Sequence, residues 1–128
     1  MQIYGIGTNI VECLRIAKMI ERYGENFICR IYTDHEIQHC RAKAFATQQY
    51  AGHWAAKEAV MKAMGTGWVR GISWRDIEIY SEPAGKQIVR LAGQARTICE
   101  EKGISDVLIS ISHCRTHATA FATAMTED

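Results

Sequence analysis

The sequence predicts an α+β fold in one domain that spans residues 1–128. Helical patterns fill most of the first half of the chain and end in a long alanine-rich stretch, whereas alternating strand patterns fill most of the second half. The segment EPAGK, with Pro and Gly in turn positions, joins two of these strands as a hairpin. A chain of 128 residues can bury one sizeable core, and we find no linker or internal repeat within it.

The N-terminal segment is predicted to form a strand followed by a helix. The strand spans Gln2–Ile6. Asn9 stands three residues before Glu12, the spacing of a capping box, so a helix is expected over Val11–Tyr23 and should stop at Gly24. Its apolar stripe is expected to be buried and consists of Ile16, Ile20 and Tyr23.

The capping-box pattern recurs at Thr33 and predicts a second helix toward Lys43. A long helix is expected from Thr47 to Met64, with Gly65 as its stop. The remaining elements expected are strands Ile77–Ser81 and Gln87–Leu91, a helix Gly93–Lys102 that ends at Gly103, and strands Asp106–Ser112 and His117–Met125.

Composition excludes several classes of protein. The net charge of +1 gives no global reason to expect nucleic acid or a membrane as partner. The 5 cysteines show neither a C-x-x-C pair nor zinc-ligand spacing, and we interpret them as reduced thiols of a cytosolic protein. The sequence lacks a signal peptide and any apolar run near the roughly 20 residues of a membrane span. We therefore expect a cytoplasmic protein.

The stretch HWAAKEAVMKAMGTGW carries the strongest chemical signal. Glu58 and Lys62 lie four residues apart and share a face of the predicted helix, and Lys57 lies about 100° around the axis from Glu58. One carboxylate beside two ammonium groups suits a magnesium ion and a phosphate. The tail Gly65–Gly67 adds backbone N–H groups that a phosphate can approach. The alternative is an ordinary Glu58–Lys62 ion pair, worth about 0.2–0.5 kcal/mol.

Four segments together identify a resemblance. YGIGTNIVECLRI, WAAKEAVMKAMGTGW, DIEIYSEPAGKQIVRLAG and ISISHC occur in the order and spacing of the holo-acyl-carrier-protein synthases, the small 4′-phosphopantetheinyl transferases. The resemblance implies a long helix packed on a small antiparallel sheet, in a homotrimer with active sites at subunit boundaries. It also implies magnesium-dependent transfer of the phosphopantetheine arm of coenzyme A to a serine of an acyl carrier protein, with release of adenosine 3′,5′-bisphosphate. Whether the pathway is fatty-acid or polyketide synthesis stays open.

The resemblance also implies roles for individual residues. The matching catalytic positions are Lys57, Glu58 and Lys62. The positions implied to contact coenzyme A are Lys62, Gly65, Gly67, Ser112 and His113, of which His113 is expected near the nucleotide. Glu58 and Asn9 match the metal ligands.

Asn9 departs from the family pattern, which has aspartate after GIGT. An amide oxygen can coordinate magnesium, but it offers a dipole where a carboxylate offers a charge, so weaker metal binding is expected. Three outcomes are open: an enzyme that needs more metal, an enzyme in which another carboxylate or water fills the position, or a protein that binds coenzyme A and transfers poorly.

A basic face on the first helix is expected to dock the acidic carrier protein. Arg15, Lys18 and Arg22 follow the three- and four-residue spacing of one helix side, with Met19 as an apolar contact and Arg30 as a further candidate. The alternative is a solvated charged face, since Glu12 and Glu21 partly cancel the field.

Two rival functions belong to other classes. A non-catalytic module could bind coenzyme A or the carrier protein after losing efficient transfer through Asn9. A structural trimer without any small-molecule ligand is the other, but it leaves the glycine tail and the Lys57, Glu58 and Lys62 grouping without a purpose.

Overall fold

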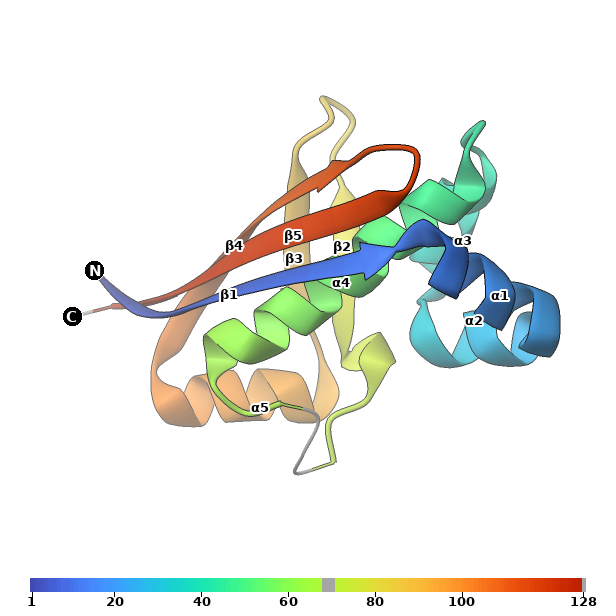
Figure 1. Ribbon diagram of the computed structural model, residues 1–128. Coiled ribbons are helices and arrows are strands. Elements are labelled where there is room, and N and C mark those ends of the chain that lie inside the picture. Colours follow the sequence, from blue (N-terminus) through green and yellow to red (C-terminus); the bar gives the residue numbers. More distant parts are fainter. Residues whose placement is uncertain (68–70, 128) are drawn as a thin grey trace.

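A computed structural model describes residues 1–67 and 71–127 of the protein. The elements follow the order β1 (Gln2–Glu12), α1 (Cys13–Tyr23), α2 (Glu25–Ile31), α3 (Asp34–Arg41), α4 (Ala46–Met64), η1 (Trp74–Asp76), β2 (Ile77–Ser81), β3 (Gln87–Leu91), α5 (Gly93–Lys102), β4 (Ile104–His113) and β5 (His117–Thr126) (Figure 1). The α+β prediction is confirmed.

The strands form two antiparallel sheets. One has the order β1-β5-β4 and the other is the β2-β3 hairpin. Helix α4 runs along the three-stranded sheet and packs on β1, β5 and β4, while α1, α2 and α3 gather near its N-terminal end (Figure 1). In the described residues, no helix has the length and apolar character needed to cross a bilayer.

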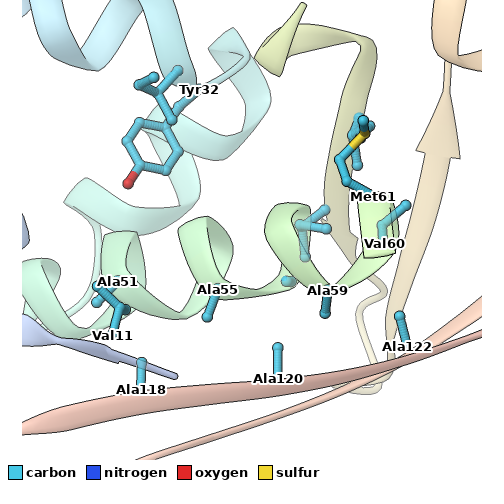
Figure 2. Close-up of a cluster of buried hydrophobic side chains, with 14 of the residues drawn as sticks. Val11, Tyr32, Ala51, Ala55, Ala59, Val60, Met61, Ala118, Ala120 and Ala122 are labelled. Atoms are coloured by element: carbon cyan, nitrogen blue, oxygen red, sulfur yellow. The ribbon is translucent and has the colours of Figure 1, made fainter. Parts of the chain in front are cut away.

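Small residues line the seam between α4 and the sheet. Alanines of α4 face alanines of β5 (Figure 2), namely Ala51, Ala55 and Ala59 opposite Ala118, Ala120 and Ala122. On β1, a Cβ at Gly5 or Gly7 would collide with the carbonyl oxygens of Ala63 and Ala59. Both glycines are therefore needed for the close approach of β1 to α4, which places the neighbouring strand residues against this helix.

The N-terminal boundary prediction is wrong. Strand β1 continues past Ile6 to Glu12, and α1 begins at Cys13 without a side-chain cap. Asn9 lies inside the strand and does not cap a helix. The reason is tertiary: the segment pairs with β5, with Ile10 opposite Thr119 and Val11 opposite Ala118. Inter-strand pairing and β-branched side chains outweigh the local capping pattern.

Two further expectations fail. Helix α2 was not predicted from the sequence. In the structure Gly24, with φ of 55°, turns the chain, and a second helix starts immediately after it. Tyr23 was expected in the buried stripe of α1, but it is 48% exposed, whereas Ile16 is fully buried. Tyr23 is the last residue of α1, next to the turn at Gly24, and its ring stays at the surface.

The remaining elements agree closely with the sequence. Thr33 forms a complete capping box with Glu36 at the start of α3. Helix α4 ends at Gly65 in the left-handed conformation, with φ of 79°. The bounds of β2, β3 and α5 are those predicted, while α3 ends two residues early and β4 and β5 extend by one to two residues.

Candidate functional site

The two predicted metal ligands lie on facing elements. On β1, Gly7 packs against the C-terminal half of α4, and Val11 lies beside its N-terminal half (Figure 2). Asn9 occupies the same face of the strand midway between them, because alternate residues of a strand share a face. It therefore stands opposite the middle turns of α4, which hold Glu58. Both side chains are half-buried.

Lys62 connects α4 to the same part of β1. Its side chain is exposed, and its Nζ donates a hydrogen bond to the backbone carbonyl of Thr8 at 2.8 Å. The Glu58 carboxylate has no ion pair or hydrogen bond to any other described residue. The ordinary Glu58–Lys62 ion pair is thus not formed, and the lysine reaches toward the strand.

A hollow of about 500 Å³ brings three of the predicted residues together. Asn9, Lys62 and Ser112 all line it, from β1, α4 and β4 respectively. Its other lining residues, hydroxyl-bearing and apolar, are Thr8, Ile10, Ser110, Thr119, Ala120 and Phe121. The hollow offers one ammonium group and several hydroxyl groups to a ligand.

The glycine tail and His113 lie toward opposite ends of α4. Gly65 follows the C-terminus of this 19-residue helix, which is about 28 Å long. His113 pairs with Ala118, whose partner on β1 is Val11, beside the N-terminal half of α4. One chain therefore does not gather Gly65 and His113 into a single contact site.

The glycine tail is accompanied by a cation that sequence reasoning missed. Lys102 on α5 donates from Nζ to the backbone carbonyl of Met64 at 3.0 Å, and this Nζ is 3.8 Å from where a Cβ on Gly65 would stand. A lysine suits this place because the C-terminus of a helix carries partial negative charge. The sequence shows only that Lys102 lies in the last turn of a helix that stops at Gly103. It does not show that this helix ends beside the C-terminus of α4.

Lys57 is not where the sequence prediction placed it. It was expected to neutralise phosphate charge beside Glu58. Its side chain is fully buried, and its Nζ has four acceptors, one of them Glu36 Oε1 at 2.7 Å. The 100° between consecutive helical residues turns Lys57 into the interior, away from Glu58. Lys57 is therefore not accessible to a ligand beside Glu58 and Lys62.

The predicted docking residues form a surface around Met19. Arg15 and Lys18 line a hollow on one side of it, and Arg30 lines a second hollow on the other. Arg22 lies over the ring of Tyr23, at 5.4 Å from its centroid. All four basic side chains are exposed. The structure thus combines positive charge with a half-buried methionine, a surface suited to an acidic partner that also carries apolar residues.

An aromatic stack connects this docking surface to α4. Arg15 lies 5.7 Å from the centroid of the Trp54 ring, and Trp54 stacks on Phe27 at 6.0 Å and on Trp74 at 4.3 Å. Trp54 precedes Glu58 by one helical turn, so the two side chains share a face of α4. The four-residue spacing of Trp54 and Glu58 can be read from the sequence, but the contact with Arg15 cannot.

The available donors fit magnesium in kind. No group of three or more His, Cys, Asp or Glu side chains among the described residues could hold a metal ion. Magnesium, however, usually keeps several waters and binds one or two protein oxygens together with substrate phosphates. The half-buried Glu58 carboxylate, which lacks another described partner, and the amide oxygen of Asn9 could provide that pair.

Comparison with known sequences identifies close relatives. Residues 5–122 match the model of the 4′-phosphopantetheinyl transferase superfamily. The holo-[acyl-carrier-protein] synthase of Rhodopirellula baltica is 43% identical over 121 residues, which cover 94% of this chain and 96% of the relative. That of Koribacter versatilis is 42% identical over 118 residues, covering 92% and 94% respectively.

Solved structures show the same fold. The holo-[acyl-carrier-protein] synthase from Neisseria meningitidis superimposes with a TM-score of 0.90 at 35% identity, covering 98% of this chain and 100% of the other. The Helicobacter pylori enzyme, solved in complex with coenzyme A, superimposes with a TM-score of 0.83 at 30% identity, covering 94% and 99%.

Proposed function

The chain belongs to the 4′-phosphopantetheinyl transferase superfamily, and we propose that it is a magnesium-dependent holo-acyl-carrier-protein synthase. It transfers the 4′-phosphopantetheine arm of coenzyme A to a serine of an apo acyl carrier protein and releases adenosine 3′,5′-bisphosphate. The observation that carries this function is that Asn9 and Lys62 line one hollow, while Glu58 lies one turn before Lys62 on α4. The fold is shared with synthases, among them one solved in complex with coenzyme A.

The metal site consists of Glu58 and Asn9. Glu58 provides a charged oxygen and Asn9 a neutral one. When bound, magnesium would neutralise charge on the pyrophosphate of coenzyme A. Because one of the two ligands is uncharged, this protein should need more magnesium than a protein with two carboxylates at these positions.

Lys62 and the glycine tail would stabilise the phosphate groups. The serine hydroxyl gives its proton to a base as its oxygen forms a bond to the β-phosphorus. The bond from this phosphorus to the bridging oxygen breaks, so negative charge grows on the leaving bisphosphate. Lys62, whose ammonium group is exposed beside Thr8, would offset that charge. Gly65 and Gly67, both with positive φ, allow backbone N–H groups to approach the pyrophosphate without an intervening side chain.

The basic surface on α1 would place the carrier protein. Arg15, Lys18, Arg22 and Arg30 attract its acidic face, and Met19 among them offers an apolar contact. Because Arg15 rests on Trp54, one turn from Glu58, a docked carrier lies close to the helix that holds the metal ligand.

A homotrimer would complete the site. The face of the sheet turned away from α4 exposes Ile6, Ile10, Leu108 and Phe121, each between 44% and 65% exposed. An apolar patch of this kind is typical of an interface. Since Gly65 and His113 lie toward opposite ends of α4 in one chain, His113 would contact the nucleotide held by a neighbouring copy, while Ser112 lines the same hollow as Asn9 and Lys62. The 5 unpaired cysteines suit the reducing cytoplasm, where we place the protein.

Mass spectrometry tests the function directly. Apo acyl carrier protein incubated with the protein, coenzyme A and magnesium should gain the mass of one phosphopantetheine group. The non-catalytic binding module predicts unchanged carrier mass at every magnesium concentration, together with a thermal shift on adding coenzyme A. The identity to synthases over most of the chain favours the enzyme.

A further inference from the structure

Three chargeable side chains that the proposed chemistry does not use meet beneath α4. Lys57 and Glu36 are fully buried and His53 is 1% exposed. Lys57 Nζ lies 2.7 Å from Glu36 Oε1, and His53 Nδ1 lies 2.8 Å from Glu36 Oε2. Buried charges are costly unless they are paired and hydrogen-bonded, so these three residues form one unit, here called the Lys57 anchor.

The ammonium group of Lys57 also holds three backbone segments. It donates to the carbonyl oxygens of Ile31 at 3.0 Å, Trp74 at 3.0 Å and Ile77 at 2.6 Å. These residues are the last of α2, the first of η1 and the first of β2. An ammonium group has three protons, and with Glu36 it has four acceptors here, so it is fully satisfied inside the protein. Lys57 thereby joins α4 to α2, α3, η1 and β2.

The two partners of Glu36 favour its ionised form. Burial alone would raise the pKa of the Glu36 carboxyl, but the hydrogen bond from His53 and the charge of Lys57 lower it overall. His53 Nε2 is buried and has no hydrogen-bond partner among the described residues. Its other ring nitrogen, Nδ1, faces the carboxylate and donates to Glu36 Oε2.

The anchor acts on the turn of α4 that carries Glu58. On the sheet side α4 rests on alanine methyl groups, which set its distance from the sheet (Figure 2). Two other orienting contacts of α4, the stack of Trp54 on Trp74 and the hydrogen bond of Lys62 to Thr8, lie about one turn from Glu58. Lys57 and Glu58 are consecutive, so a rotation that moves one moves the other. We propose that Lys57 is a positioning residue: its buried anchor fixes the rotation of α4 and holds the Glu58 carboxylate opposite Asn9. This inference rests on the metal site of the proposed function.

Stability alone is a poor reason for the anchor. Replacing a buried ion pair with apolar residues of similar volume is often neutral or stabilising, whereas removing one partner is strongly destabilising. The directional bonds to four other segments add a defined orientation of α4. A positioning role and a purely structural role therefore make different predictions for variants that remove one partner or both.

Two variants and a control separate these roles. Lys57→Met removes the ammonium group and leaves Glu36 without this partner, while Glu36→Gln combined with Lys57→Met removes both the carboxylate and the ammonium group. Val60→Ala, which opens a gap elsewhere in the core around α4, is the destabilised control. Each protein is examined for thermal unfolding, for Mn²⁺ binding in the presence of coenzyme A by loss of the free-ion EPR signal, and for transfer.

We expect the double variant to regain much of the melting temperature lost in Lys57→Met. It should still bind Mn²⁺ about tenfold more weakly than the wild-type protein, which is the size of effect seen when a metal site loses an orienting partner. Val60→Ala should melt earlier but keep the wild-type Mn²⁺ affinity. Wild-type Mn²⁺ binding by the folded double variant would overturn the positioning role while leaving the proposed function intact. A wild-type protein that neither binds Mn²⁺ with coenzyme A nor transfers would overturn both.

Discussion

Lys62 on α4 donates a hydrogen bond to the carbonyl oxygen of Thr8 on β1, although 54 residues separate them in the chain. The bond joins the helix that holds Glu58 to the residue before Asn9. Lys62, the residue expected to contact the substrate, therefore connects the strand and the helix that form the proposed metal and phosphate site.

Replacement of Lys62 should separate charge from packing. Lys62→Met should lower kcat by about 10²-fold, because growing phosphate charge loses a cation, with a change in unfolding free energy within about 0.5 kcal/mol for this exposed side chain. Lys62→Arg, which keeps the charge, should retain a larger share of the activity. Steady-state kinetics and urea unfolding provide the two measurements; equal activity in both variants would contradict the role.

Asn9→Asp should strengthen metal binding. A second carboxylate beside Glu58 adds a full negative charge, so the magnesium concentration for half-maximal transfer should fall by roughly tenfold. Gln38→Glu, which adds the same charge on the exposed side of α3, is the matched control and should leave the requirement unchanged. An unchanged or higher magnesium requirement in Asn9→Asp would contradict this role of Asn9.

Gly7→Ala should destabilise the protein by about 2 kcal/mol or more, because its methyl group would overlap the carbonyl oxygen of Ala59 and the Cβ of Lys62. Gly52→Ala is the control, since its methyl group would meet only Ile111 at 3.1 Å and alanine favours a helix. Thermal and urea unfolding measure the difference. Similar losses in both variants would refute the close approach of β1 to α4.

Arg15→Ala should raise the KM for the carrier protein by roughly fivefold with little change in kcat, because it removes a charge and a cation–π contact from the docking surface. The effect should shrink at high salt. Arg96→Ala, which removes an exposed arginine from α5, should leave this KM unchanged. An unaltered KM in Arg15→Ala would remove Arg15 from the docking surface.

Acid should weaken the fold through Glu36. Its pKa is lowered from 4.5 in the folded protein, so the unfolded chain binds its proton first as the pH falls. The carboxylate therefore contributes stability that is fully present above pH 4.5 and is lost as the pH falls through the folded pKa. Urea unfolding at a series of pH values should show a steeper loss below pH 4.5 for the wild-type protein than for Glu36→Gln. Parallel curves would contradict this contribution.

Local patterns determined much of the structure. The left-handed stop at Gly65, the capping box at Thr33 and the hairpin around EPAGK depend on neighbouring residues, so the sequence alone placed α4, α3, β2 and β3. Motif order likewise indicated the family and singled out Glu58 and Lys62, because helical spacing puts both on one face.

Tertiary packing decided the rest. Pairing with β5 kept residues 9–12 extended where the capping pattern favoured a helix. Burial turned Lys57, an apparent phosphate ligand, toward Glu36, a partner 21 residues earlier in the chain. Neither outcome can be read from neighbouring residues, since both depend on free energies of pairing and desolvation that arise only when distant segments meet.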